Sequence, residues 1–365
     1  MSALGRPIAT RLERPLADLR IWGGTLLTPL RLIVGWTYFS AFWRRLVLEN
    51  KLLPGEPGYI GEKFNHFLPN ALGIGPIIEF FVSHPELLWW KLVAFTIVEG
   101  VVGLALMAGL LTRAMGVATS LLALGILLGA GWLGTTCLDE WQIGVLGIGG
   151  GLAFAYAGGG RYSADYLLAR RFGAGKPGLL SWARGVAPSE APIMGKLVIV
   201  SSVAAFGLTL LTNQVFHNGV WGDLHNKSVR PVVELSEAEV RGDELKVRLY
   251  RVEGADVYGS FAIGLRLLDD AGAIVAEWSA DELSRLPDDA IDNHYVARIQ
   301  PGTHSLVLPL GAKADVSLRH PELTQLGAGD YRVELLDISG LSWTTPLQVG
   351  SKHVPTGNLD DGRRE

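Results

Sequence analysis

The sequence predicts a membrane α-helical bundle, made of a four-helix core and a fifth span, followed by a C-terminal all-β sandwich domain. Only 19% of the 365 residues are charged, compared with about 25% in typical soluble domains. The apolar excess lies before residue 216, whereas most acidic residues lie after it. The single cysteine excludes a disulfide scaffold, and a net charge of −4 gives no sign of nucleic-acid binding.

Five segments are candidates for transmembrane helices, each of which needs about 20 mostly apolar residues. These segments are 26–48, 87–111, 113–133, 141–158 and 194–216. The second and third are the clearest, and the fourth is short and rich in glycine, which is typical of closely packed helices in lipid. The first contains Arg31, Arg44 and Arg45, of which Arg31 lies near one end and can extend to the membrane surface.

Orientation follows from the distribution of lysine and arginine. With five spans, the basic segment 1–25, the turn at 112–113 and the loop 171–193 all lie on one side, which we assign to the cytoplasm. The four-span domain then covers 26–170, and the fifth span, 194–216, leads the chain to the outer side. No small-residue cleavage site follows the first apolar run, so we expect no cleavable signal peptide.

Residues 217–350 predict an antiparallel β-sandwich on the outer side, and the polar tail 351–365 is expected to be disordered. Turn signals such as Arg241-Gly242-Asp243 separate short apolar segments. The expected strands are 232–240, 244–252, 260–268, 274–278, 295–299, 305–310, 331–336 and 347–349. The histidines of this domain are scattered and have no metal-type spacing, so we interpret them as solvated or turn residues.

Cys137 is the first candidate for chemistry, because it lies in a short outer loop between two spans. The thiol is either a small apolar filler or a reactive group. A following helix N-terminus and nearby cations favour the thiolate, whereas Asp139 and Glu140 oppose it unless they relay protons.

Three charged residues in the spans are further candidates. Arg44 and Arg45 lie at the outer end of the first span, where they either anchor the helix at the interface or bind a tetrahedral oxyanion. They point about 100° apart on a helix, so one can face the bundle and the other the headgroups. Glu99 lies in the middle of the second span and is either a structural carboxyl or a proton carrier.

Two outer segments supply more polar residues. Lys63 and His66 are three residues apart in the loop 49–86, which either forms a lid over the membrane face or is simply solvated. After the fifth span, His225 and Lys227 either complete an anion pocket or belong to a structured linker. Trp132 and Trp141 bracket the cysteine loop in the interfacial belt, where a quinone ring can be reached from the bilayer.

Two sequence motifs carry a resemblance to a known family. The four-span block, with Arg44-Arg45 and Cys137-Leu138-Asp139-Glu140-Trp141-Gln142, resembles DoxD of membrane thiosulfate:quinone oxidoreductase. The fifth span and β-domain, opening with Gly219-Val220-Trp221-Gly222-Asp223-Leu224-His225-Asn226-Lys227-Ser228, resemble its companion DoxA. The resemblance covers about residues 20–350 and implies oxidation of thiosulfate to tetrathionate. It also implies a membrane quinone of the ubiquinone or menaquinone type as electron acceptor.

The resemblance further implies a multi-pass protein of the bacterial cytoplasmic membrane, with its C-terminal domain in the periplasm. Fusion into one chain departs from the two-subunit form and leaves a homo-oligomer open. No haem, iron–sulfur or flavin motif is visible, and no metal site is expected.

The chemistry is then expected to use sulfur and quinone alone, with Cys137 holding an S-thiosulfonate. We assign the binding of the thiosulfate anion to Arg44, Arg45, Lys63, His66, His225 and Lys227. Proton transfer is assigned to Glu99 and Asp139, with His66. The quinone is expected to bind at Trp132, Trp141 and Gln142. The alternative is a non-enzymatic transporter or anchor with an outer ligand-binding β-domain.

Overall fold

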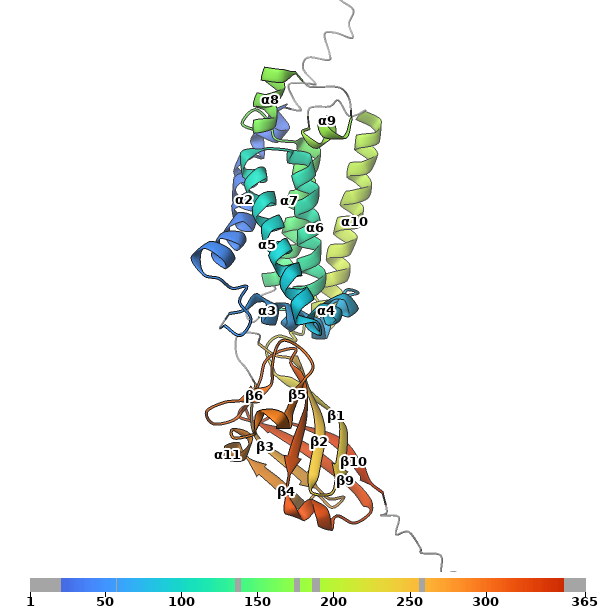
Figure 1. The fold of residues 1–365 in the computed structure, drawn as a ribbon. Coiled ribbons are helices and arrows are strands. Elements are labelled where there is room, and N and C mark those ends of the chain that lie inside the picture. The colour runs from blue at the N-terminus through green and yellow to red at the C-terminus, as the bar shows by residue number, and fades with distance from the viewer. Residues whose placement is uncertain are drawn as a thin grey trace, which may run out of the picture. The chain divides into compact units, whose positions relative to one another are not determined.

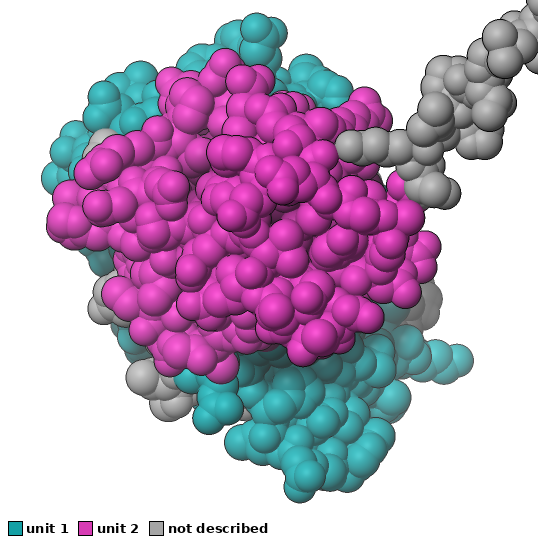
Figure 2. Space-filling model, turned by 90° about the horizontal axis from the view of Figure 1, so that it is seen from below, with its two compact units in different colours: residues 1–230, 253–256 teal, residues 231–252, 257–365 magenta. Residues whose placement is uncertain are grey.

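The computed structural model describes residues 21–56, 58–134, 139–173, 178–185, 191–255 and 260–350, with the side chains at 139 and 191–193 excepted. The chain divides into two compact units, which Figure 2 shows in different colours. The first contains the residues up to 230 together with 253–256, and the second contains 231–252 and the residues from 257 onward. The first unit is helical and the second is all-β.

Long helices lie side by side in the first unit (Figure 1). The helices are α2 (Thr28–Phe42), α3 (Ile60–Phe67), α4 (Gly75–Val82), α5 (Pro85–Ala108), α6 (Thr112–Ala130), α7 (Asp139–Ala157), α8 (Ala164–Phe172), α9 (Leu179–Ala183) and α10 (Ala191–His217). A π-helical turn, η1 (Trp43–Leu48), extends α2, and a 3-10 turn, η2 (Leu68–Asn70), follows α3. The predicted loop 49–86 therefore contains two short helices.

Within the described part of the chain, three helices are long and apolar enough to cross a membrane: Pro85–Ala108, Thr112–Ala130 and Met194–His217. They correspond to the second, third and fifth predicted spans. No residue of the most apolar window of α10 is fully buried against the rest of the chain, so much of this helix surface is left to contact lipid.

Close contact between helices depends on glycine. A Cβ at Gly103 of α5 would lie 2.4 Å from the backbone nitrogen of Phe39 in α2. A Cβ at Gly151 of α7 would lie 2.5 Å from the carbonyl oxygen of Gly116 in α6. Larger residues would force these pairs of helices apart, as expected for packing in lipid, where small residues let backbones approach.

The second unit consists of two antiparallel sheets, as the alternating pattern predicts. One has the order β1-β2-β8-β5 and the other β10-β9-β3-β7-β6, with β4 paired to β3. The strands are β1 (Val232–Arg241), β2 (Glu244–Glu253), β3 (Ser260–Leu268), β4 (Ile274–Ser279), β5 (Ile291–Asn293), β6 (Gln300–Pro301), β7 (Leu306–Leu308), β8 (Lys313–Arg319), β9 (Gly329–Asp337) and β10 (Ser342–Val349). Leu245, Leu265, Val316 and Val333 are fully buried in the shared core.

The predicted strand at 295–299 is wrong, because this segment is irregular. Its alternate apolar residues are buried as in a strand, but the side chain of Asn293 takes the backbone hydrogen bonds of Ile299. The Ile299 amide donates to Asn293 Oδ1 at 2.8 Å, and Asn293 Nδ2 donates to the Ile299 carbonyl at 3.1 Å. The central strand β8 was missed, although Ala314, Val316 and Leu318 alternate with polar residues.

Candidate functional site

The predicted nucleophile, Cys137, and the side chain of Asp139 lie outside the residues that the structure describes. The residues that lead into and out of their loop are described, however. Gly134 marks the beginning of this cysteine loop, and Glu140, in the first turn of α7, marks its end. Both flanks are held by side chains from other parts of the helical unit.

Two side chains that follow α10 hold the beginning of the cysteine loop. The Gly134 carbonyl accepts hydrogen bonds from Asn226 Nδ2 and Ser228 Oγ, both at 2.5 Å. The Gly134 amide donates to Ser228 Oγ at 2.9 Å. The Asn226 side chain also contacts Ser228 Oγ at 2.7 Å, and Ser228 is only 1% exposed. This pair, Asn226 and Ser228, forms what we call the glycine clamp.

The residues just before Gly134 are also fixed. Trp132 is fully buried, and its Nε1 donates to the carbonyl oxygen of Phe67 at the end of α3, at 3.2 Å. His217, at the end of α10, contacts the Gly131 carbonyl through Nε2 at 3.0 Å. Trp132 therefore lies inside the helical unit rather than in a lipid-exposed belt, and its hydrogen bond to Phe67 helps to fix the residues that precede Gly134.

The end of the loop is held by α3 and α10. Lys63 Nζ lies 3.7 Å from Glu140 Oε1. Trp141 is half-buried, and its Nε1 donates to Thr212 Oγ1 of α10 at 3.0 Å. Gln142 is exposed on α7. Since Lys63 is itself half-exposed, its charge is available near the loop without a large desolvation cost.

Helix α3 brings further titratable groups to the same region. Lys63 and His66 lie one turn apart on α3, as their spacing predicts. Glu62 lies on the same helix, and burial raises the pKa of its carboxyl. A carboxyl whose pKa is raised by burial is a candidate proton carrier. The sequence analysis did not identify Glu62, and only the position of this residue in the outer loop 49–86 could have indicated it as a site candidate.

The two adjacent arginines of the first predicted span separate in the structure. Arg45 forms an ion pair and a hydrogen bond with Glu99 of α5, whose side chain is 4% exposed. Arg44 is exposed, and its Nε donates to the Ser40 carbonyl at 3.3 Å. The buried Glu99 charge is thus balanced by a cation from a different helix, and Arg44 keeps its charge at the surface.

Lys227 lies beside a cavity in the helical unit. Its Nζ donates to Asn70 Oδ1 at 2.8 Å and lies 3.9 Å from Glu253 Oε1. Its carbonyl accepts a hydrogen bond of 2.8 Å from the Gly254 amide. The cavity measures about 160 Å³ and is lined by Asn70, Ala71, Leu72, Val215, Phe216 and Lys227. His225 is half-buried nearby in sequence, and its amide donates to the His217 carbonyl at 3.1 Å.

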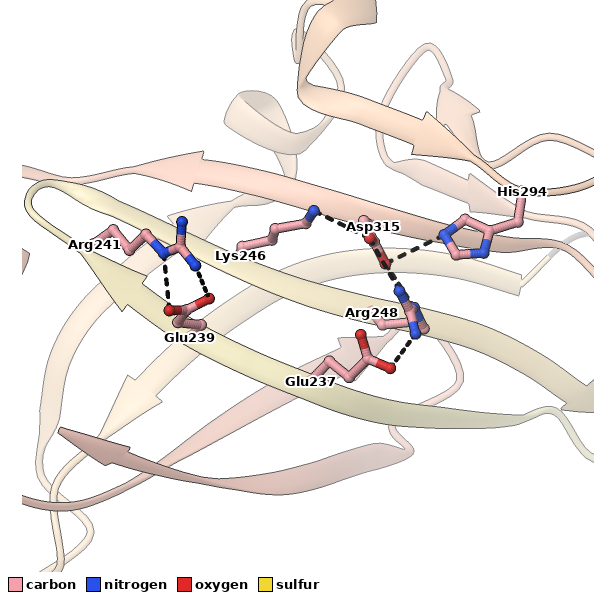
Figure 3. A network of polar contacts seen from close by, with 7 residues as sticks. All are labelled: Glu237, Glu239, Arg241, Lys246, Arg248, His294 and Asp315. Carbon is pink, nitrogen blue, oxygen red and sulfur yellow. Dashed lines mark hydrogen bonds and ion pairs between the residues drawn. The ribbon is translucent and has the colours of Figure 1, made fainter. Parts of the chain in front are cut away.

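The β unit contains one dense ionic network (Figure 3). Asp315 of β8 contacts Arg248 Nε at 2.7 Å, Lys246 Nζ at 3.1 Å and His294 Nε2 at 3.4 Å. Arg248 also pairs with Glu237 of β1. Hydrogen bonds from Arg248 lower the pKa of Asp315 to about 2. Arg248 and Asp315 are cross-strand partners, so we interpret this network as stabilising the sheet.

No cluster of three or more potential metal ligands among histidine, cysteine, aspartate and glutamate occurs in the part of the chain that the structure describes. The polar groups around the cysteine loop are instead amides, hydroxyls, ammonium groups and isolated carboxyls. Such groups can bind an oxyanion and transfer protons.

Two protein-family models match the chain. The model described as "TQO small subunit DoxD" matches residues 26–182. The model described as "TQO small subunit DoxA" matches residues 216–346. The first match contains both flanks of the cysteine loop, and the second contains the glycine clamp.

Proposed function

We propose that this chain is a thiosulfate dehydrogenase that reduces a membrane quinone. The chain belongs to the DoxD and DoxA families of thiosulfate:quinone oxidoreductase small subunits, which are joined here in one polypeptide. Two thiosulfate dianions, one quinone and two protons give one tetrathionate dianion and one quinol. The observation that carries this proposal is the glycine clamp, because two side chains of the DoxA region bind the DoxD residue that leads into the cysteine loop.

The proposed topology has five spans in the bacterial cytoplasmic membrane. Helix α2 with η1, and helices α5, α6 and α7, form the four-span domain, and α10 is the fifth span. The three apolar helices and the basic residues of 1–25 and 171–193 support this arrangement, with the N-terminus in the cytoplasm and the β-sandwich of 217–350 in the periplasm. Tail residues 351–365 lie outside the described part of the chain.

The proposed chemistry is covalent and begins at Cys137. The thiolate adds to a ring carbon of the quinone and one proton is taken up, which gives a neutral cysteinyl adduct. The outer sulfur of a thiosulfate then attacks the cysteine sulfur and breaks the bond between sulfur and the ring. The electron pair of that bond leaves with the ring, and a second proton completes the quinol.

A second thiosulfate completes the cycle. It attacks the sulfane sulfur of the S-thiosulfonate on Cys137, which breaks the bond to the cysteine sulfur. Tetrathionate leaves, and the cysteine sulfur keeps the electron pair as the thiolate. The quinone is the only species reduced, and the two thiosulfates together lose two electrons.

Cations near the site have two tasks in this scheme: they attract two dianions and offset their mutual repulsion. Arg44 and Lys63 are suited to this, because both are exposed, and His66 lies one turn from Lys63. Arg45 acts through its ion pair with Glu99, which we propose as an internal proton carrier together with Asp139. His225 and Lys227 lie on either side of Asn226, within the same segment as the glycine clamp.

The test is thiosulfate-dependent reduction of decylubiquinone by the purified protein in detergent. Cys137→Ser should abolish turnover while the protein still elutes as a folded species, and Ser236→Ala, at an exposed site on β1, should leave turnover unchanged. Mass spectrometry of the wild-type protein after thiosulfate and quinone should find the S-thiosulfonate on Cys137. Near-normal turnover of Cys137→Ser would refute the covalent scheme, and thiosulfate uptake by proteoliposomes without quinone reduction would favour a transporter.

A further inference from the structure

The cavity beside Lys227 has the size of a single six-membered ring. A cavity of about 150 Å³ in a protein interior accommodates benzene, and this cavity measures about 160 Å³. Four of its lining residues are apolar: Ala71, Leu72, Val215 and Phe216. The remaining two, Asn70 and Lys227, carry an amide and an ammonium group. The walls thus suit a flat apolar ring that carries a small number of polar atoms.

One lining residue of the cavity is also exposed on the surface of α10, the proposed fifth span. Val215 of α10 is 45% exposed, whereas its neighbour Phe216 is 3% exposed. The apolar face of α10 continues from Val215 through Leu211, one turn earlier and 55% exposed. A ring held in the cavity could therefore extend a long apolar tail along α10 into the bilayer, without crossing any charged side chain of that helix face.

Lys227 supplies a hydrogen-bond donor at the polar end of the cavity. An ammonium group has three donors, and Asn70 Oδ1 accepts one of them at 2.8 Å. Glu253 lies at 3.9 Å, beyond hydrogen-bond distance. The hydrogen bond from the Gly254 amide to the Lys227 carbonyl holds the backbone in place. A fixed cation at a ring oxygen stabilises the negative charge that develops when the ring is reduced.

The cavity and the beginning of the cysteine loop share one support. Lys227 lies between Asn226 and Ser228 in sequence, and these two form the glycine clamp on Gly134. Any shift of this segment moves the ammonium and the loop entrance together. A reducible ring at Lys227 is therefore held in a constant relation to the residue that precedes the cysteine loop.

From these four observations we propose that the cavity between 70–72 and Val215–Phe216 binds the headgroup of the membrane quinone, with Lys227 donating to a ring carbonyl. This inference rests on the proposed function for the identity of the ring. It assigns Lys227 to the quinone rather than to thiosulfate, and it replaces the assignment of the headgroup to Gln142, which does not line the cavity.

The test combines photolabelling with a matched pair of variants. An azidoquinone is photolysed with the full-length protein in detergent, without thiosulfate, and the labelled peptides are mapped. Labelling is expected on peptides that contain 70–72 or 215–216. Val215→Trp is expected to fill the cavity and remove this labelling, whereas Leu211→Trp places the same side chain one turn away on α10 and should retain it.

Kinetics give an independent readout. Val215→Trp should raise KM for decylubiquinone at least tenfold and leave KM for thiosulfate unchanged, and Lys227→Met should act in the same direction. Leu211→Trp should match the wild type. Labelling of wild-type protein around 141–150 of α7, or unchanged labelling of Val215→Trp, would overturn the assignment. Because labelling needs no thiosulfate, the expected label in a protein without thiosulfate turnover would refute the proposed function and support the quinone site.

Discussion

Replacing Ser228 with alanine removes the centre of the glycine clamp. The change deletes the hydrogen bond from Ser228 Oγ to the Gly134 carbonyl and the one from the Gly134 amide to Ser228 Oγ. Each such bond contributes about 1 kcal/mol net, and a stranded amide adds about 1–3 kcal/mol if no water reaches it. Gly134 is half-buried and its carbonyl keeps Asn226, so we expect a loss near the lower end, about 2 kcal/mol.

A loss of about 2 kcal/mol raises the population of the locally open loop entrance by about 30-fold. Hydrogen exchange read by mass spectrometry should show this increase in a peptide that ends at Gly134, and turnover should fall because the loop entrance is no longer held. Asn226→Ala should have a smaller effect, because Ser228 retains both bonds to Gly134. Ser236→Ala, at an exposed serine of β1, is the matched control. Unchanged exchange and turnover in Ser228→Ala would show that the clamp does not position the loop.

Three further predictions follow from the charged groups. Replacing Arg45 leaves the Glu99 carboxylate buried without its cation and should cost about 3 kcal/mol, measured by thermal unfolding in detergent. Replacing Glu99 should cost less, because the Arg45 side chain is 21% exposed. The double replacement should recover much of the larger loss, and a double loss equal to the sum of the two single losses would contradict coupling. Lys63→Ala removes a solvent-screened ion pair, so the free energy of unfolding should change by less than about 0.5 kcal/mol. The KM for thiosulfate should rise several-fold. An unchanged KM would show that Lys63 does not bind thiosulfate. The pKa of Asp315 is lowered to about 2 by Arg248, so its contribution of about 2 kcal/mol is present above pH 4 and is lost as the pH falls from about 4 to 2. Asp315→Asn should flatten this part of the stability curve, and an unchanged acid midpoint would argue against the network.

The helical and β regions could be predicted from the sequence because each has a simple pattern of apolar residues. Continuous apolar segments predict α5, α6 and α10, and alternation predicts β1 to β4. The prediction failed at 295–299, where the side chain of Asn293 replaces a strand partner. Periodicity reports which side chains are buried, and it does not report where a backbone amide finds its acceptor.

For the candidate site, the sequence indicated residue types but not their partners. It singled out Arg45 and Glu99, which carry charge inside predicted spans, and Lys63 and Lys227, which lie in polar outer segments. It did not reveal that Arg45 pairs with Glu99, 54 residues away. Nothing in the sequence alone indicated that Ser228 matters. Its importance is seen only from its hydrogen bond with Gly134, which lies 94 residues earlier in the chain.

Taken alone, the amino-acid order predicted a membrane protein with an antiparallel β-domain, and it showed that the chain has one cysteine, between two apolar segments. Hydrophobic burial acts on each segment according to its own composition, so these properties are local. Only the tertiary structure decided which side chains hold that loop, which arginine neutralises Glu99, and where a ring-sized cavity opens beside Lys227. Hydrogen bonds and ion pairs depend on distances of a few ångströms between distant residues, and those distances exist only once the helices have packed.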